Sequence, residues 1–92
     1  MTCTAISAVI PRTRTVVVGQ VASVTAHIRP WKRVDVILGD GTGTITLRFL
    51  GRTEIPGMSE GRTVRAEGTA GLERQLLTML NPVYELTPTR TR

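Results

Sequence analysis

One short cluster carries most of the chemistry that the sequence offers. Arg29, Lys32 and Arg33 lie within five residues of one another, and Trp31 stands between them. Guanidinium groups contact phosphates through two nitrogens, and an indole ring can stack on a nucleobase. The cluster therefore predicts a local contact with single-stranded nucleic acid. A Trp31 that folds back over the end of the fold is the alternative, and the spacing leaves both interpretations open.

The sequence contains no group of residues that matches a known catalytic arrangement. A nucleophile needs a neighbouring base, but the chain has one histidine, His27, and one cysteine, Cys3, far apart in the sequence. The glycine-rich segment 39–43 is not followed by the Gly-Lys-Ser/Thr of a phosphate-binding loop, and it is better explained as a hairpin turn. One cysteine and one histidine also cannot form a structural zinc site. We expect no catalytic residue, metal, cofactor or small-molecule substrate, and a protein that is not an enzyme.

The positive charge is concentrated towards the two ends of the chain. Twelve basic side chains face seven acidic ones, which gives a formal net charge of +5. Four of the basic residues are Arg12, Arg14, Arg90 and Arg92. Between residues 15 and 86, eight basic residues remain against all seven acidic ones, so this part is nearly neutral. Any contact with nucleic acid must therefore come from a local patch or from the terminal segments.

The length and hydropathy limit the fold to one small domain. Ninety-two residues with 40% hydrophobic side chains suit a single packed unit. The apolar stretch at residues 5–10 is too short to span a bilayer, and no basic residue precedes it as a secretory signal would require. We expect a cytoplasmic protein that does not contact a membrane.

The cluster must be positioned by a long first strand that begins at Thr15 and ends before Pro30. Its apolar residues share one face only if one residue is skipped near residues 22–23, which predicts a bulge and a strong bend. The residues on that face are Val17, Gly19, Val21, Val24, Ala26 and Ile28. A long, curled first strand is typical of small barrels, because one strand then serves both halves of the closed sheet.

The rest of the chain predicts four more strands. Residues 34–38 and 45–49 form a hairpin around the Asp-Gly turn, with Phe49 in the core, and residues 63–70 form the fourth strand after a connector at 51–61. Residues 72–80 have leucines at helical spacing, but four strands cannot close a barrel. We therefore predict that 75–86 is a fifth strand, interrupted at Pro82. Tyr84 is either a packing residue or an exposed stacking platform.

These elements resemble an OB-fold, a five-stranded Greek-key barrel. The sequence is similar to small actinobacterial OB-fold proteins, and through them to the OB domain of helicases that act on branched DNA. The resemblance covers residues 15–87, with 1–14 as a flexible lead-in and 88–92 as a flexible basic tail. The motifs that carry it are Val17-x-Gly19-x-Val21, Asp40-Gly41-Thr42-Gly43-x-Ile45-x-Leu47, Leu50-Gly51-Arg52, Gly57 with Gly61, and Asn81-Pro82 followed by Tyr84-Glu85-Leu86.

The resemblance implies binding of single-stranded or junction nucleic acid on the face of the second and third strands. Together with the cluster, it gives a candidate nucleic-acid site of Arg29, Trp31, Lys32, Arg33, Arg48, Leu50, Arg52 and Arg74. The expected function is weak, largely sequence-independent binding of single-stranded DNA or RNA, as an accessory in DNA repair or recombination. The alternative is a protein-interaction module that docks a helicase or ribosomal partner through the barrel groove or the edge of the last strand.

Overall fold

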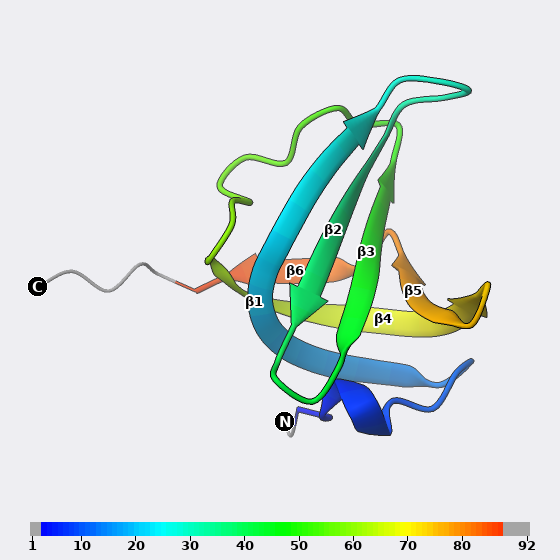
Figure 1. Ribbon diagram of the computed structural model, residues 1–92, viewed down its shortest axis with the longest axis vertical. Coiled ribbons are helices and arrows are strands. Elements are labelled where there is room, and N and C mark those ends of the chain that lie inside the picture. The colour runs from blue at the N-terminus through cyan, green and yellow to red at the C-terminus, as the bar shows by residue number, and fades with distance from the viewer. Residues whose placement is uncertain (1–2, 88–92) are drawn as a thin grey trace, which may run out of the picture.

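A single sheet of six strands holds most of the chain (Figure 1). The computed structural model describes residues 3–87, so the predicted basic tail at 88–92 lies outside the described residues. Within residues 3–87 there is no α-helix, and no helical segment is long and apolar enough to cross a membrane. The elements are the 3-10 turn η1 (Ile6–Ala8) and the strands β1 (Arg14–His27), β2 (Arg33–Gly39), β3 (Thr44–Leu50), β4 (Thr63–Glu73), β5 (Leu76–Leu80) and β6 (Val83–Leu86).

Five of the strands close a ring of hydrogen bonds. They follow the order β1-β2-β3-β5-β4, and β4 pairs again with β1. The ring closes because residues 14–20 of β1 pair with β4 while residues 20–27 pair with β2. All pairings are antiparallel except that of β3 with β5, which is parallel. The predicted all-β class is confirmed, and the closed ring gives the sheet a barrel-like form.

The predicted bend of the first strand is also confirmed. The register between β1 and β2 shifts between Val21 and Ser23, which is the skipped residue expected from the sequence. The expectation that the residues after the bulge share the buried face is wrong, because Val24, Ala26 and Ile28 are exposed where the chain runs beyond the core. At Gly19 the strand passes so close to its neighbour that an added Cβ would lie 2.6 Å from the carbonyl oxygen of Gly39. A side chain at this position would push β1 away from β2, so the bend requires glycine.

The ambiguous last segment is extended, as predicted. Residues 76–80 form β5 between β3 and β4, and residues 83–86 form β6, which pairs with β4 alone. Asn81, at a φ of 46°, and Pro82 separate the two strands. The helical spacing of the leucines is overridden because β5 completes the backbone hydrogen bonds of both β3 and β4.

The core lies inside the ring. Phe49 is buried as predicted, and its ring meets that of Tyr84 edge-on, with the centroids 5.4 Å apart. Tyr84 is therefore a packing residue and not an exposed stacking platform. The buried core side chains are Ile6, Val17, Val21, Val34, Val36, Leu38, Ile45, Leu47, Phe49, Ile55, Met58, Val64, Ala66, Ala70 and Met79.

The segment before Thr15 is not a loosely attached lead-in. Ile6 is 1% exposed and belongs to the core, and the amide of Thr4 donates a hydrogen bond to the carbonyl of Val16 at 2.7 Å. The packed unit therefore begins before residue 15. The sequence did not show this because residues 1–14 have no clear apolar period, and Ile6 is anchored by contacts with distant residues.

Asp40, in the turn between β2 and β3, holds the segment before Thr15 against the sheet through a hydrogen bond. One of its carboxylate oxygens accepts a hydrogen bond from the Ile6 amide at 2.9 Å, and the other accepts bonds from the hydroxyl and the amide of Thr42 at 2.6 and 2.9 Å. The hydroxyl of Thr42 and the two amides stabilise the charged form, and they lower the pKa of Asp40 from 3.8 to about 2.

This arrangement predicts an acid dependence of stability. Because the pKa of Asp40 is lower in the folded protein than in the unfolded chain, its contribution to the free energy of unfolding is present above pH ~4 and is lost as the pH falls from about 4 to about 2. Urea unfolding across this range should show a shallower decline for Asp40→Asn than for the unaltered protein. Equal declines in the two proteins would contradict the assignment.

Candidate nucleic-acid interface

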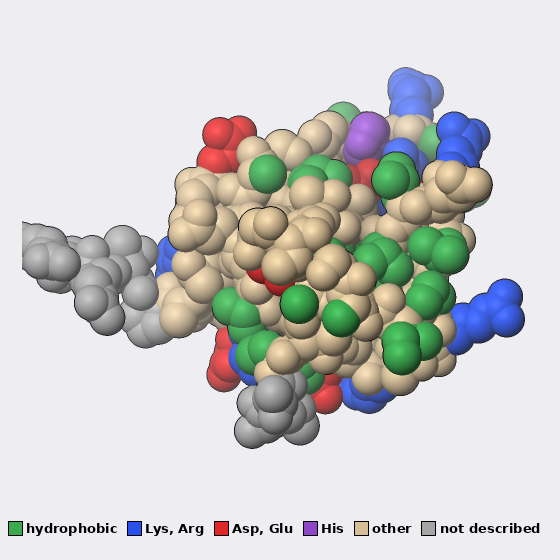
Figure 2. Space-filling model, turned by 60° about the horizontal axis from the view of Figure 1, so that its bottom comes forward, with side chains coloured by type: hydrophobic (Ala, Val, Ile, Leu, Met, Phe, Trp, Pro, Cys, Tyr) green, Lys and Arg blue, Asp and Glu red, His purple; other side chains and the backbone are tan. Residues whose placement is uncertain are grey.

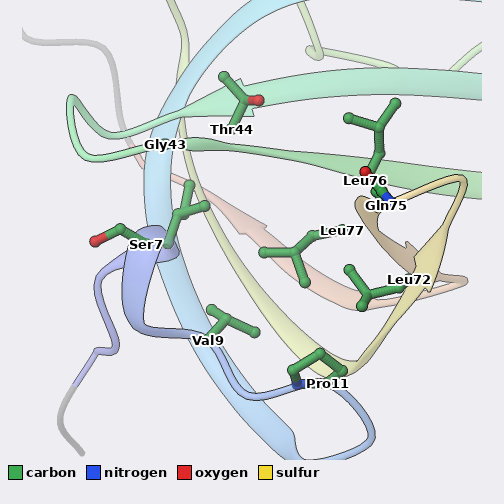
Figure 3. A pocket seen from close by; sticks show the side chains of 10 residues that line it. Ser7, Val9, Pro11, Gly43, Thr44, Leu72, Gln75, Leu76 and Leu77 are labelled. Carbon is green, nitrogen blue, oxygen red and sulfur yellow. The ribbon is translucent and has the colours of Figure 1, made fainter.

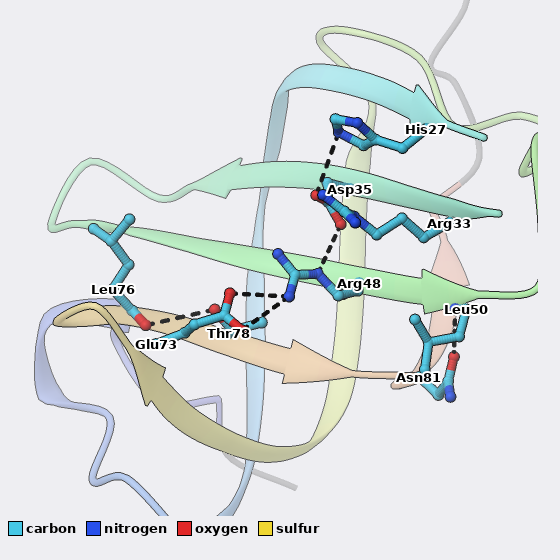
Figure 4. Close-up of polar contacts among 9 residues, drawn as sticks. All are labelled: His27, Arg33, Asp35, Arg48, Leu50, Glu73, Leu76, Thr78 and Asn81. Carbon is cyan, nitrogen blue, oxygen red and sulfur yellow. Dashed lines mark hydrogen bonds and ion pairs between the residues drawn. The ribbon is translucent and has the colours of Figure 1, made fainter. Parts of the chain in front are cut away.

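The outer face of β2 and β3 carries a row of ion pairs (Figure 4). Asp35 of β2 lies directly opposite Arg48 of β3, and both point outward because alternate strand residues face opposite sides of the sheet. Asp35 Oδ1 is 3.0 Å from Arg48 Nε, and Asp35 Oδ2 is 3.3 Å from Arg33 Nε. His27 of β1 reaches the same carboxylate at 3.7 Å. We call Arg33, Asp35, Arg48 and Glu73 the ion-pair row.

Arg48 is held from both sides in this row. Its Nη1 lies 2.9 and 3.0 Å from the two carboxylate oxygens of Glu73, which comes from the end of β4. Two hydrogen bonds raise the pKa of the Arg48 guanidinium. The bond with Asp35 has the larger effect, and the bond with Glu73 the smaller. A phosphate that approached the Nε or Nη1 of Arg48 would compete with a carboxylate already bound there. The candidate residues Arg33 and Arg48 therefore lie on the predicted face, but the protein itself satisfies their charges.

The loop between β1 and β2 is different, because its two cations, Arg29 and Lys32, form no ion pair within residues 3–87. Trp31 is 65% exposed, so it does not fold back over the end of the ring. Arg29 and Lys32 are exposed beside it. An unpaired cation on each side of an exposed indole is what contact with a base and its flanking phosphates requires.

Backbone hydrogen bonds bring two further candidates to this loop. The Gly51 amide donates to the Lys32 carbonyl at 2.8 Å, which sets Leu50 and Arg52 beside the loop. Leu50 is partly exposed, and Arg52 is exposed and forms no ion pair within residues 3–87. We call Arg29, Trp31, Lys32, Leu50 and Arg52 the loop end of the molecule.

Asn81 extends this surface by fixing the end of β5. Its amide donates to the Arg48 carbonyl at 2.7 Å, and its side-chain oxygen accepts from the Leu50 amide at 3.0 Å. Leu80, which pairs with Arg48 across β3 and β5, is exposed next to Leu50 as a result. Sequence reasoning missed Leu80, because its place beside Leu50 depends on the parallel pairing of β3 with β5. Figure 2 brings forward the opposite end of the molecule, with the N-terminal segment and the β2–β3 turn, and it shows hydrophobic side chains gathered on one side with Lys and Arg side chains projecting at the edge.

Arg74 is not part of this surface. It lies in the turn between β4 and β5 at a φ of 52°. Leu76, just after this turn, lies at the Thr44 end of β3, whereas Trp31 lies near the Leu50 end. β3 has seven residues, so six residue steps separate these two ends, a distance of roughly 20 Å at about 3.3 Å per residue. The structure thus places Arg74 apart from the loop end, although its neighbour in the chain, Glu73, pairs with Arg48.

Comparisons with family models and with curated proteins found no match to this chain. Within residues 3–87 no three His, Cys, Asp or Glu side chains are grouped so that they could hold a metal ion. The candidate interface therefore consists of the loop end and the neighbouring ion-pair row.

Proposed function

We propose that this protein is an OB-fold that binds single-stranded nucleic acid weakly, with little sequence preference, through its loop end. The ring of five strands supports the fold assignment, because the bent β1 serves both halves of it and the connections are those of a small Greek-key barrel. The glycine and hairpin motifs that resemble actinobacterial OB-fold proteins support it as well. That resemblance also suggests an accessory role in DNA repair or recombination.

The observation that carries the proposal is the exposed Trp31 between unpaired cations. Stacking of one base on an aromatic ring contributes about 1–3 kcal/mol, and Arg29 and Lys32 lie where the phosphates on either side of that base would pass. The affinity should be modest for two reasons. Of the three aromatic residues, Phe49 and Tyr84 pack against each other and leave Trp31 as the stacking platform. The ion-pair row also neutralises the adjacent face.

A titration tests this function directly. Fluorescence polarisation of labelled single-stranded DNA and RNA of about 12 nucleotides, at about 50 and 200 mM salt, should show binding that weakens with salt. Contacts from Arg29, Lys32 and Arg52 predict a slope of log K against log salt of about −2, at roughly 0.7 per contact. Binding that does not change with salt, or no binding at the lower salt concentration, would contradict the proposal.

The second candidate function is a protein-interaction module, and the edge of β6 favours it. β6 is the last strand in the sheet order and, within residues 3–87, pairs with β4 alone, so its other edge offers a place for a strand from a partner. A helicase or a ribosomal component would be such a partner. Titrations that fail with both DNA and RNA would favour this function over nucleic-acid binding.

A further inference from the structure

An apolar groove lies at the end of β3 away from the loop end (Figure 3). It has a volume of about 310 Å³ and runs between the N-terminal segment and the hairpin of β4 and β5, next to the turn of β2 and β3. Ile6 and Leu77, which pack in or against the core, form its base. Val9 and Pro11 line one side, and Leu72 and Leu76 line the other.

The walls of this groove are more exposed than ordinary packing would leave them. Leu72 is 59% exposed and Leu76 is 63% exposed. Both lie at the end of a hairpin, where polar residues are more usual than leucine. Ile10, between the lining residues Val9 and Pro11, is also largely exposed. Large apolar side chains that gather around one concave site indicate a surface that a partner covers.

The charges at the rim indicate the chemistry of that partner. Arg12 follows Pro11 and Arg74 precedes Gln75, so a cation stands next to the lining residues on each side. Both arginines are exposed, and neither joins an ion pair among residues 3–87. The carboxylate next to Arg74, that of Glu73, is held by Arg48, and Asp40 is held by the amides of Ile6 and Thr42. Two exposed arginines, each next in the chain to a lining residue, therefore add positive charge beside the apolar lining.

We propose that this groove binds an acidic segment of a partner protein, which inserts leucine or similar apolar side chains between Leu72, Leu76 and Val9 while its carboxylates meet Arg12 and Arg74. The chain's own residues 88–92 are excluded as the occupant, because they contain two arginines and no acidic residue. A second copy is disfavoured because each copy has a net charge of +5. Nucleic acid does not fit, because the groove offers no aromatic ring on which a base could stack.

A titration followed by NMR tests the groove without reference to nucleic-acid binding. The probe is a synthetic peptide of about 12 residues with leucines three and four apart among Glu and Asp, added to the full-length ¹⁵N-labelled protein. Saturable shift changes are expected at Ser7, Val9, Leu72 and Leu76. A matched peptide with lysine in place of each Glu and Asp should bind at least tenfold more weakly, because Arg12 and Arg74 would repel it.

Variants make the outcome specific to the groove. Leu76→Glu and Arg74→Glu should each weaken binding of the acidic peptide about tenfold or more, whereas Val83→Glu, an equally exposed apolar site on β6, should leave it unchanged. The amide spectra report whether each variant is folded. The proposal is overturned if the peptide does not bind, if its shifts fall at the loop end, if Leu76→Glu binds it normally, or if sedimentation shows that the groove joins two copies of this chain.

Discussion

Replacing Trp31 with alanine is expected to weaken binding of single-stranded nucleic acid by about 5- to 150-fold, the equivalent of about 1–3 kcal/mol for one stacked base. The folded state should hardly change, because an indole that is 65% exposed contributes little to the core. Polarisation titrations give the affinity, and thermal unfolding of the same variant gives the stability. Nucleic acid should also quench the tryptophan fluorescence of the unaltered protein, since Trp31 is its single tryptophan.

Ile28→Ala is the matched control for this substitution. Ile28 is an exposed apolar residue of the same loop, so its truncation removes hydrophobic surface but no stacking ring. It should change the affinity by less than about threefold. If Trp31→Ala lowers the melting temperature while leaving the affinity intact, Trp31 is not part of the site.

Reversing two charges of the loop, in the double variant Arg29→Glu with Lys32→Glu, should also strongly weaken the binding of nucleic acid. Two phosphate contacts are lost and two repulsive charges are introduced, so the affinity at low salt should fall more than tenfold. The slope of log K against log salt should also become shallower by about 1.4, at roughly 0.7 per contact on a single strand. Titration of the double variant at several salt concentrations measures both quantities.

The matched control moves the same change in net charge to the apolar groove. Arg12→Glu with Arg74→Glu alters the total charge equally, but it does so at the end of β3 remote from Trp31. This variant should lose much less affinity for nucleic acid than the loop variant. Equal losses would mean that binding follows the total charge, and the loop end would then have no special role.

The sequence alone determined the elements whose signals are local. Period-two alternation and the Asp-Gly turn predicted β2, β3 and their hairpin, and the skipped residue in β1 predicted its bulge. The burial of Phe49 followed from its phase with Ile45 and Leu47. The cluster around Trp31 was also visible, because an aromatic residue among cations is a feature of neighbouring residues. None of these features needs knowledge of which distant segments meet.

Only the tertiary structure determined which of the described arginines are held in ion pairs and which are not. Arg48 and Glu73 are 25 residues apart in the chain, and they meet because β5 pairs with both β3 and β4 and brings the end of β4 towards β3. Arg48 and Arg74 look alike in the sequence, yet one is neutralised by two carboxylates and the other forms no ion pair within residues 3–87 and lies beside an apolar groove. The alternation of apolar residues indicates which face a side chain lies on, but it does not encode strand order or register.

The same reason explains the last segment and the N-terminal segment. The leucines of residues 72–80 have helical spacing, and it is the unfilled place between β3 and β4 that makes residues 76–80 a strand. Ile6 lies in a short apolar stretch without a clear period, and it is buried because it packs into the core formed by distant strands. Asp40, 34 residues later, also accepts a hydrogen bond from its amide. Local sequence thus determined β2, β3 and the bulge of β1, and it indicated which residues could bind. Long-range hydrogen bonds determined how the ring closes and which of those residues remain available to a ligand.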